Sequence, residues 1–162
     1  QPLVTLDYNQ ICIMTATGHA LIGTVIAAKV GNPVLAVPIA IASHFLADAF
    51  PHWDTGTNKK QKSKKTFMIE SAFDVILGFV LSWILITWVF PETNLAYAFL
   101  IIIMAQLPDW LTIPYLFFGL KLPFFYSVYK AQKIFDTRLG LPWGVINQAA
   151  AILALIVFSK ML

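Results

Sequence analysis

Histidine and carboxylate side chains recur at four-residue spacing in this apolar chain, a spacing that suits the joint binding of a metal ion. His44 and Asp48 form one such pair, and Glu70 and Asp74 form another. Residues four apart in an α-helix project from one face, one turn above the other. Histidine with carboxylate, and without thiolate, favours Zn²⁺, Mn²⁺ or Fe²⁺. We therefore expect a divalent-metal site, most simply a zinc site, and the number of candidate ligands allows two or three ions.

The candidate groups all lie at the same end of successive apolar segments. If these segments cross a membrane in alternating directions, the groups meet at one membrane face. A charged side chain deep in a bilayer costs about 2.5–3.5 kcal/mol, and clustered carboxylates repel one another unless a cation or protons intervene. The predicted metal ligands are His19, His44, Asp48, His52, Asp54, Asp74 and Asp109, and the predicted acid–base residues are Glu70 and Asp74.

Structural explanations compete with this interpretation at individual positions. Asp109 and His52 are each equally well explained as interface or capping groups near helix ends. Asp54 is equally well explained as a turn residue. Asn147 and Gln148 are better explained by hydrogen bonds between helices. The argument for a metal site rests on the joint clustering of these groups, because independent accidents would not share one membrane face.

The composition predicts an all-α polytopic membrane protein. The chain is 59% hydrophobic and 12% charged, with a mean hydropathy of +0.75, whereas soluble domains are about 45–50% apolar and about 25% charged. A spanning helix needs about 20 mainly apolar residues. Five spans are predicted, at 14–30, 33–51, 67–90, 95–118 and 142–161, in a single domain over 14–162 that follows an N-terminal extension at 1–13.

A further stretch, residues 123–136, carries apolar residues at helical spacing. It suits a helix lying in the headgroup layer, and an irregular loop explains it equally well.

The basic residues predict the orientation of the bundle. Nine of the 11 lysines and arginines lie in the loops beside the polar cluster, and two, Lys29 and Lys160, lie on the far side. Lysine and arginine near span ends are retained on the cytoplasmic side. We therefore expect a protein of the inner membrane, with its N-terminus and its metal site facing the cytoplasm.

Two motifs resemble a known family. Thr17-Gly18-His19 and the stretch from Ser43-His44 through Asp48 to Pro51-His52-Trp53-Asp54 resemble the membrane-bound metal-dependent hydrolases, including the LexA-binding inner-membrane hydrolase group. They are similar, more distantly, to the zinc-dependent phospholipase C and S1/P1 nuclease superfamily. The resemblance implies that His19, His44, Asp48 and His52 are zinc ligands. The later His-x-x-x-Glu pair of the nucleases has no match, so Glu70 and Asp74 would have to substitute.

These observations together predict a membrane-embedded hydrolase that uses metal-activated water against a phosphoester. A site at the level of the inner leaflet suits a lipid-like phosphorylated substrate, whose anion the lysine-rich loops would attract. The bilayer is then the main partner, no nucleic acid is expected, and a homo-oligomer is compatible with the sequence. The alternatives are a metal-binding transporter, which the apolar far halves of the spans disfavour, and a non-enzymatic scaffold.

Overall fold

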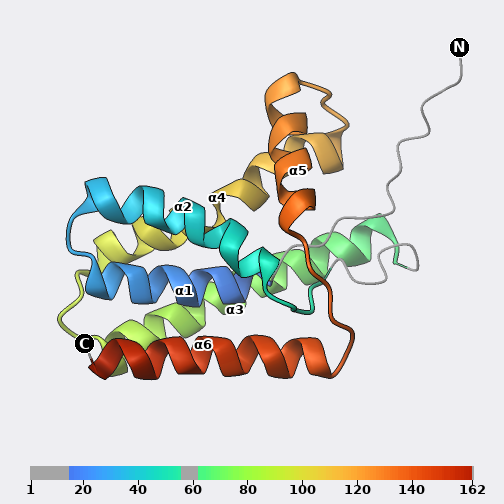
Figure 1. Cartoon of the computed structure of the whole chain (residues 1–162). Coiled ribbons are helices and arrows are strands. Elements are labelled where there is room, and N and C mark those ends of the chain that lie inside the picture. Colours follow the sequence, from blue (N-terminus) through green and yellow to red (C-terminus); the bar gives the residue numbers. More distant parts are fainter. Residues whose placement is uncertain (1–14, 56–61, 162) are drawn as a thin grey trace, which may run out of the picture.

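The computed structural model of the chain describes residues 15–55 and 62–161, and the regular elements of this part are all helices (Figure 1). Each of the five predicted spans corresponds to one helix, with end points within three residues of the prediction. The N-terminal extension predicted at 1–13 lies outside the described residues. The helices are α1 (Ala16–Lys29), α2 (Pro33–Ala49), α3 (Lys64–Val89), α4 (Leu95–Phe118), α5 (Pro123–Phe135) and α6 (Trp143–Met161).

Three of these helices, α3, α4 and α6, are long and apolar enough to cross a membrane. The other two predicted spans form shorter helices, since α1 has 14 residues and α2 has 17. At 1.5 Å per residue they extend about 21 and 26 Å, less than the roughly 30 Å of a hydrocarbon core. The all-helical membrane class is thus supported, and the short helices make the bundle uneven in length.

Helix α1 is the centre of the bundle and packs on α2, α3, α4 and α6. Glycines allow two of these contacts to be close. A Cβ on Gly23 would lie 3.0 Å from the Ala105 Cβ of α4, and a Cβ on Gly78 of α3 would lie 3.0 Å from the Ala20 Cβ of α1. Small residues at such crossings let helix backbones approach one another in a membrane. The position of α1 along its neighbours is therefore set by these contacts.

The two ends of the bundle differ in character. At one end lie the short turns between α1 and α2 and between α3 and α4 (Figure 1). Asn32 and Asn94 cap the following helices there, because their side-chain oxygens accept hydrogen bonds from Val34 N at 2.9 Å and Tyr97 N at 3.0 Å. The opposite end carries the N-terminus of α1 and the C-terminus of α2, and it is there that the polar groups gather.

Residues 123–135 form a helix rather than an irregular loop. In Figure 1, α5 stands across the direction of the bundle helices, at the polar end, and it contacts α4 and α2. Its inner side buries Tyr129 and Gln132, while Phe124 and Ile134 are exposed. Helix α5 thus covers the polar end of α2 and α4 with one polar and one aromatic side chain.

The connection from α5 to α6 holds the loop that follows α2. His52 N donates to Thr137 O at 3.2 Å, and Leu139 N donates to His52 O at 2.8 Å. Gly144 at the start of α6 is in tight contact with the same loop, since a Cβ there would lie 2.7 Å from Trp53 N. The loop carrying His52 is therefore clamped between two segments that follow it by about 90 residues.

Candidate metal centre

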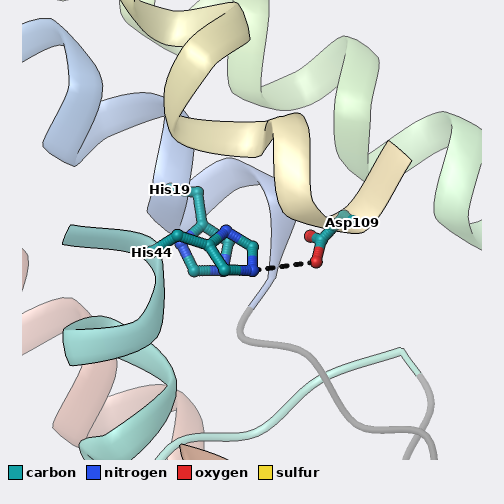
Figure 2. Close-up of side chains that lie close together, drawn as sticks. All are labelled: His19, His44 and Asp109. Carbon is teal, nitrogen blue, oxygen red and sulfur yellow. Dashed lines mark ion pairs between the residues drawn. The ribbon is translucent and has the colours of Figure 1, made fainter. Parts of the chain in front are cut away.

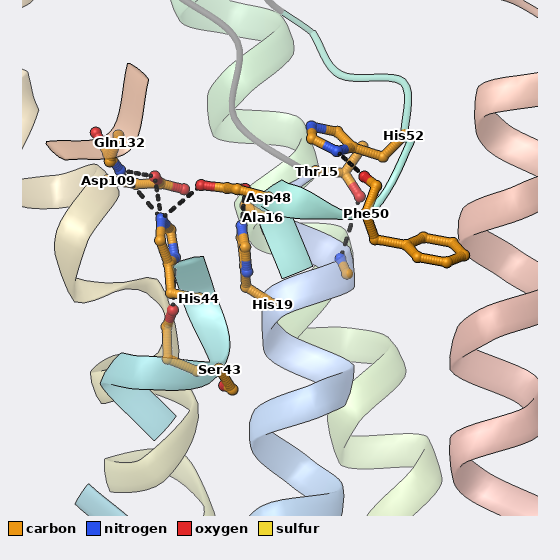
Figure 3. A network of polar contacts seen from close by, with 12 residues as sticks. Thr15, Ala16, His19, Ser43, His44, Asp48, Phe50, His52, Asp109 and Gln132 are labelled. Atoms are coloured by element: carbon orange, nitrogen blue, oxygen red, sulfur yellow. Dashed lines mark hydrogen bonds and ion pairs between the residues drawn. The ribbon is translucent and has the colours of Figure 1, made fainter. Parts of the chain in front are cut away.

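His44 lies at the centre of the polar cluster and is fully buried. Its Nδ1 lies 2.9 Å from the Ala105 carbonyl oxygen, which can only accept, so Nδ1 carries a proton and donates it. The other ring nitrogen, Nε2, lies 3.0 Å from Asp109 Oδ1 (Figure 2) and 3.3 Å from Asp48 Oδ2 (Figure 3). In a neutral imidazole with this tautomer, the Nε2 lone pair faces two carboxylates. A cation between these groups, either a proton or a metal ion, would relieve their repulsion.

His19 of α1 stacks on His44 of α2. The ring centroids are 3.9 Å apart and the planes are inclined by 19°. His19 Nε2 lies 3.2 Å from Asp48 Oδ1. This nitrogen is buried, and among the described residues it has no hydrogen bond of good geometry. Figure 3 shows the Asp48 carboxylate beside the outer ends of both rings. His19, His44 and Asp109 each offer a ligand atom within 4.8 Å of the others, so this group could hold a metal ion.

Gln132 of α5 completes the cluster from outside. Its Nε2 donates to Asp109 Oδ1 at 2.7 Å and lies 3.0 Å from His44 Nε2. Sequence reasoning missed Gln132, since a neutral amide in an amphipathic helix carries no ligand signature. Its burial at the inner face of α5, against His44 and Asp109, is visible only in the tertiary structure. Because it orients a candidate ligand, we expect it to tune metal affinity.

Gln132→Ala should weaken metal binding by about ten- to a hundred-fold, the usual effect of removing a group that orients a ligand. Isothermal titration of metal into the purified protein in detergent measures this. Ser127→Ala, an exposed position on the same helix, should leave the affinity unchanged. Equal affinities for wild type and Gln132→Ala would show that the amide does not act on the site.

The Asp74 carboxylate lies at the N-terminus of α1. It accepts hydrogen bonds from Ala16 N at 2.7 Å, Thr17 N at 3.2 Å and Thr17 Oγ1 at 2.7 Å. The first N–H groups of a helix have no partner within the helix and favour a negative charge. Asp74 of α3 thus supplies a capping charge to α1 across a helix interface.

Glu70, the other predicted acid–base residue, lies near the start of α3. It pairs with Lys62 at 2.6 Å, and Lys62 also donates to Thr55 O at 3.0 Å. The Glu70 side chain is 37% exposed. The two members of the Glu70–Asp74 pair therefore make different contacts, Glu70 with Lys62 and Asp74 with the first turn of α1.

His52 is buried and lies in the loop after α2. Its Nδ1 lies 2.7 Å from Phe50 O, so Nε2 is left as an acceptor, and this atom has no hydrogen-bond partner in the described part of the chain. Burial raises the pKa of the neighbouring Asp136 carboxyl, whereas Arg138, at 3.2 Å, acts to lower it. His52 is thus placed apart from the stacked histidines, with a free ring nitrogen of its own.

The predicted hydrogen bonds of Asn147 and Gln148 between elements are present. Asn147 Nδ2 donates to Pro51 O at 2.6 Å, and Gln148 Nε2 donates to Thr15 Oγ1. Both fasten the start of α6 to the polar end of the bundle.

A cavity of about 480 Å³ lies beside the cluster, between the first turns of α3 and the last turns of α4. Three carboxylates, those of Asp54, Asp74 and Asp109, line it where it approaches the histidines, and Ala16 at the start of α1 also borders it. The rest of the lining is almost wholly apolar. Asp109 is 14% exposed and belongs to both the cluster and the cavity, so a molecule in the cavity would reach the candidate ligands at Asp109.

Comparisons of the chain with protein-family models, with curated proteins and with solved structures found no match. The assignment of this site accordingly depends on its own geometry.

Proposed function

We propose that this chain is a membrane-embedded, metal-dependent hydrolase acting on a phosphoester of an amphiphilic substrate. The proposal is carried by one observation, the His44 ring nitrogen that faces the Asp48 and Asp109 carboxylates while its partner nitrogen donates to a backbone carbonyl. A histidine that binds metal through one nitrogen almost always donates the other N–H to a carbonyl or carboxylate. The same hydrogen bond would hold His44 ready to bind a divalent ion.

The donor set fits a borderline metal such as zinc. His19 Nε2, His44 Nε2 and a carboxylate oxygen of Asp109 would hold the ion, and the Asp48 carboxylate, which lies beside both ring nitrogens, would offset its charge. Three protein ligands are typical of catalytic zinc sites, which keep a fourth position for water or substrate. A bound ion would lower the pKa of water towards neutrality and polarise a phosphoryl oxygen.

The surrounding residues would position the substrate and move the proton. Asp109 belongs to both the ligand group and the cavity lining, so a phosphate in the cavity would lie next to a residue that would hold the ion. Asp54 is buried and lines the same cavity, which places its carboxylate to accept a proton from the attacking water. Gln132, which donates to Asp109 Oδ1, would hold the Asp109 carboxylate in the orientation that suits contact with both the ion and the substrate.

The orientation of the protein is part of the proposal. We propose that α1, α2, α3, α4 and α6 all belong to the membrane domain, with the polar end at the cytoplasmic face of an inner membrane. Support comes from the basic residues that border this end, among them Lys62, Lys64 and Arg138, since such residues are retained in the cytoplasm. Their charge would also attract an anionic headgroup.

The function is tested by hydrolysis of a phosphoester amphiphile by the full chain in detergent micelles, after loading with Zn²⁺ or Mn²⁺. We expect activity that a chelator abolishes and that metal restores. Asp109→Asn should lower kcat/KM by about a hundred-fold or more, because it would lower the affinity for the metal ion and disturb the placement of the substrate phosphate. Glu92→Gln, an exposed acid in the far turn, is the matched control. The proposal would be refuted if the chelator did not change the rate of hydrolysis, or if the metal-loaded protein hydrolysed no phosphoester.

A further inference from the structure

The cavity beside the metal centre exists because α1 is shorter than the two helices on which it packs. Helices α3 and α4 each pack extensively on α1 but make few contacts with one another. Helix α1 begins at Ala16, level with Asp74 of α3. Ten residues of α3 precede Asp74, or about 15 Å of helix. Within residues 15–55 and 62–161, α1 does not extend beyond Ala16 between α3 and α4, and the cavity lies at this level.

The walls of this cavity are chemically graded. Its inner part carries Asp54, Asp74 and Asp109, and its outer part carries aliphatic and aromatic side chains. Phe67 and Phe117 stack across the gap with their centroids 5.5 Å apart. At the aqueous end of α3, Lys64 Nζ donates to Phe117 O at 2.8 Å and ties the two helices together. Such a gradient suits a ligand with a polar head and a hydrocarbon tail.

Part of the cavity lining is exposed on the outer surface of α3 and α4. Four large apolar residues of its lining are also exposed on the outer surface, with exposed fractions of 48%, 60%, 39% and 73% for Met68, Ile76, Ile113 and Phe118. They belong to α3 and α4, two of the helices long and apolar enough to span a bilayer. If α3 and α4 span the bilayer, this apolar rim would let a lipid chain pass sideways into the cavity.

We propose that this cavity, the α3–α4 groove, binds one hydrocarbon chain of the substrate and places its phosphate at Asp109. This inference rests on the proposed function and names its substrate class, a phosphorylated amphiphile that enters laterally from the membrane. An apolar cavity of about 150 Å³ holds benzene, or about 25 Å³ per carbon. At that ratio the 480 Å³ of the groove holds a single chain of about 15–20 carbons. A second chain would remain in the bilayer.

The test uses a binding readout that requires no hydrolysis. A single-chain alkyl phosphonate with a diazirine in its chain is photolysed with the full, metal-loaded protein in micelles, and the labelled peptides are identified by mass spectrometry. We expect labelling concentrated on Met68–Ile76 and Ile113–Phe118. Ala72→Trp, which fills the groove from an exposed position of its lining, should lower this labelling about ten-fold or more. Ala150→Trp on the exposed face of α6 should not change it.

The outcomes separate the groove from the chemistry. Even labelling of all lipid-facing helices, unaffected by Ala72→Trp, would overturn the groove while leaving metal-dependent hydrolysis of phosphoesters intact. Groove labelling in a protein that hydrolyses no phosphoester would refute the proposed function and retain the lipid site. In an active protein, Ala72→Trp should reduce hydrolysis of a long-chain ester and spare that of a short, water-soluble one. Equal loss on both substrates would contradict the role of the groove in chain binding.

Discussion

His44→Ala should remove the metal ion from the purified protein. A four-ligand zinc site contributes about 10–16 kcal/mol of binding free energy, so one ligand contributes about 3 kcal/mol, or about a hundred-fold in Kd. The loss of His44 also removes the stacking partner of His19 and the group that faces both carboxylates. Metal content measured by plasma mass spectrometry should fall from near-stoichiometric to background.

His52→Ala is the informative companion to this variant. His52 lies in the loop after α2 and is not a member of the ligand group formed by His19, His44 and Asp109 in the described part of the chain, so its loss should leave an ion there in place. A fall from two equivalents to one would show that His52 binds a second ion. A folded wild-type protein that contains no metal and cannot be loaded would contradict the site itself. In that case a proton, held between His44 and the carboxylates, would be the better explanation.

Asp74→Ala should destabilise the protein by about 3–5 kcal/mol without removing the metal. The two N–H groups that donate to the Asp74 carboxylate would lose their acceptor in a place that is 9% exposed. The Thr17 hydroxyl would keep the Asp74 backbone carbonyl as an acceptor, at 3.0 Å. Each unsatisfied buried donor costs about 1–3 kcal/mol. Thermal unfolding in detergent, followed by circular dichroism, measures the change in stability.

Two controls separate capping from ligation. Asp74→Asn keeps a carbonyl oxygen that can accept from α1, so its loss of stability should be smaller. Glu70→Ala, one turn earlier on α3, removes a partly exposed ion pair and should cost about 1 kcal/mol or less. If Asp74→Asn lowers the metal content while stability is kept, the carboxylate is a ligand, as the sequence predicted. Unchanged stability of Asp74→Ala would contradict the capping role.

Much of the fold could be predicted from the sequence, because its determinants are local. Apolar runs of about 20 residues, bounded by Gly31-Asn32-Pro33 or Pro91, specify helices and turns whatever their neighbours are. The His44–Asp48 pairing is local too, since residues four apart on one helix must share a face. For residues 123–135 the sequence left a helix and an irregular loop as alternatives. The amphipathic pattern there is short, and the helix packs on α2 and α4 only in the tertiary structure.

The arrangement of the site was decided by tertiary structure. The predicted pair Glu70 and Asp74 has the same spacing as His44 and Asp48, but Glu70 pairs with Lys62 and Asp74 accepts hydrogen bonds from α1. The four-residue spacing places two side chains on the same face of a helix, but it does not determine which other element packs against that face. That depends on the rotation and axial position of each helix, which small residues such as Gly23 and Gly78 determine through close backbone contacts.

Gln132 could not be identified from the sequence for the same reason. A glutamine in a short amphipathic helix carries no functional signature, and it contacts His44 and Asp109 only because α5 packs across α2 and α4. The groove likewise arises from the difference in length between α1 and α3, combined with the place where they cross. The sequence by itself determined a helical membrane protein rich in histidine and carboxylate ligands at one end. Packing determined which of those ligands meet, because contacts between helices depend on relative positions that no local pattern encodes.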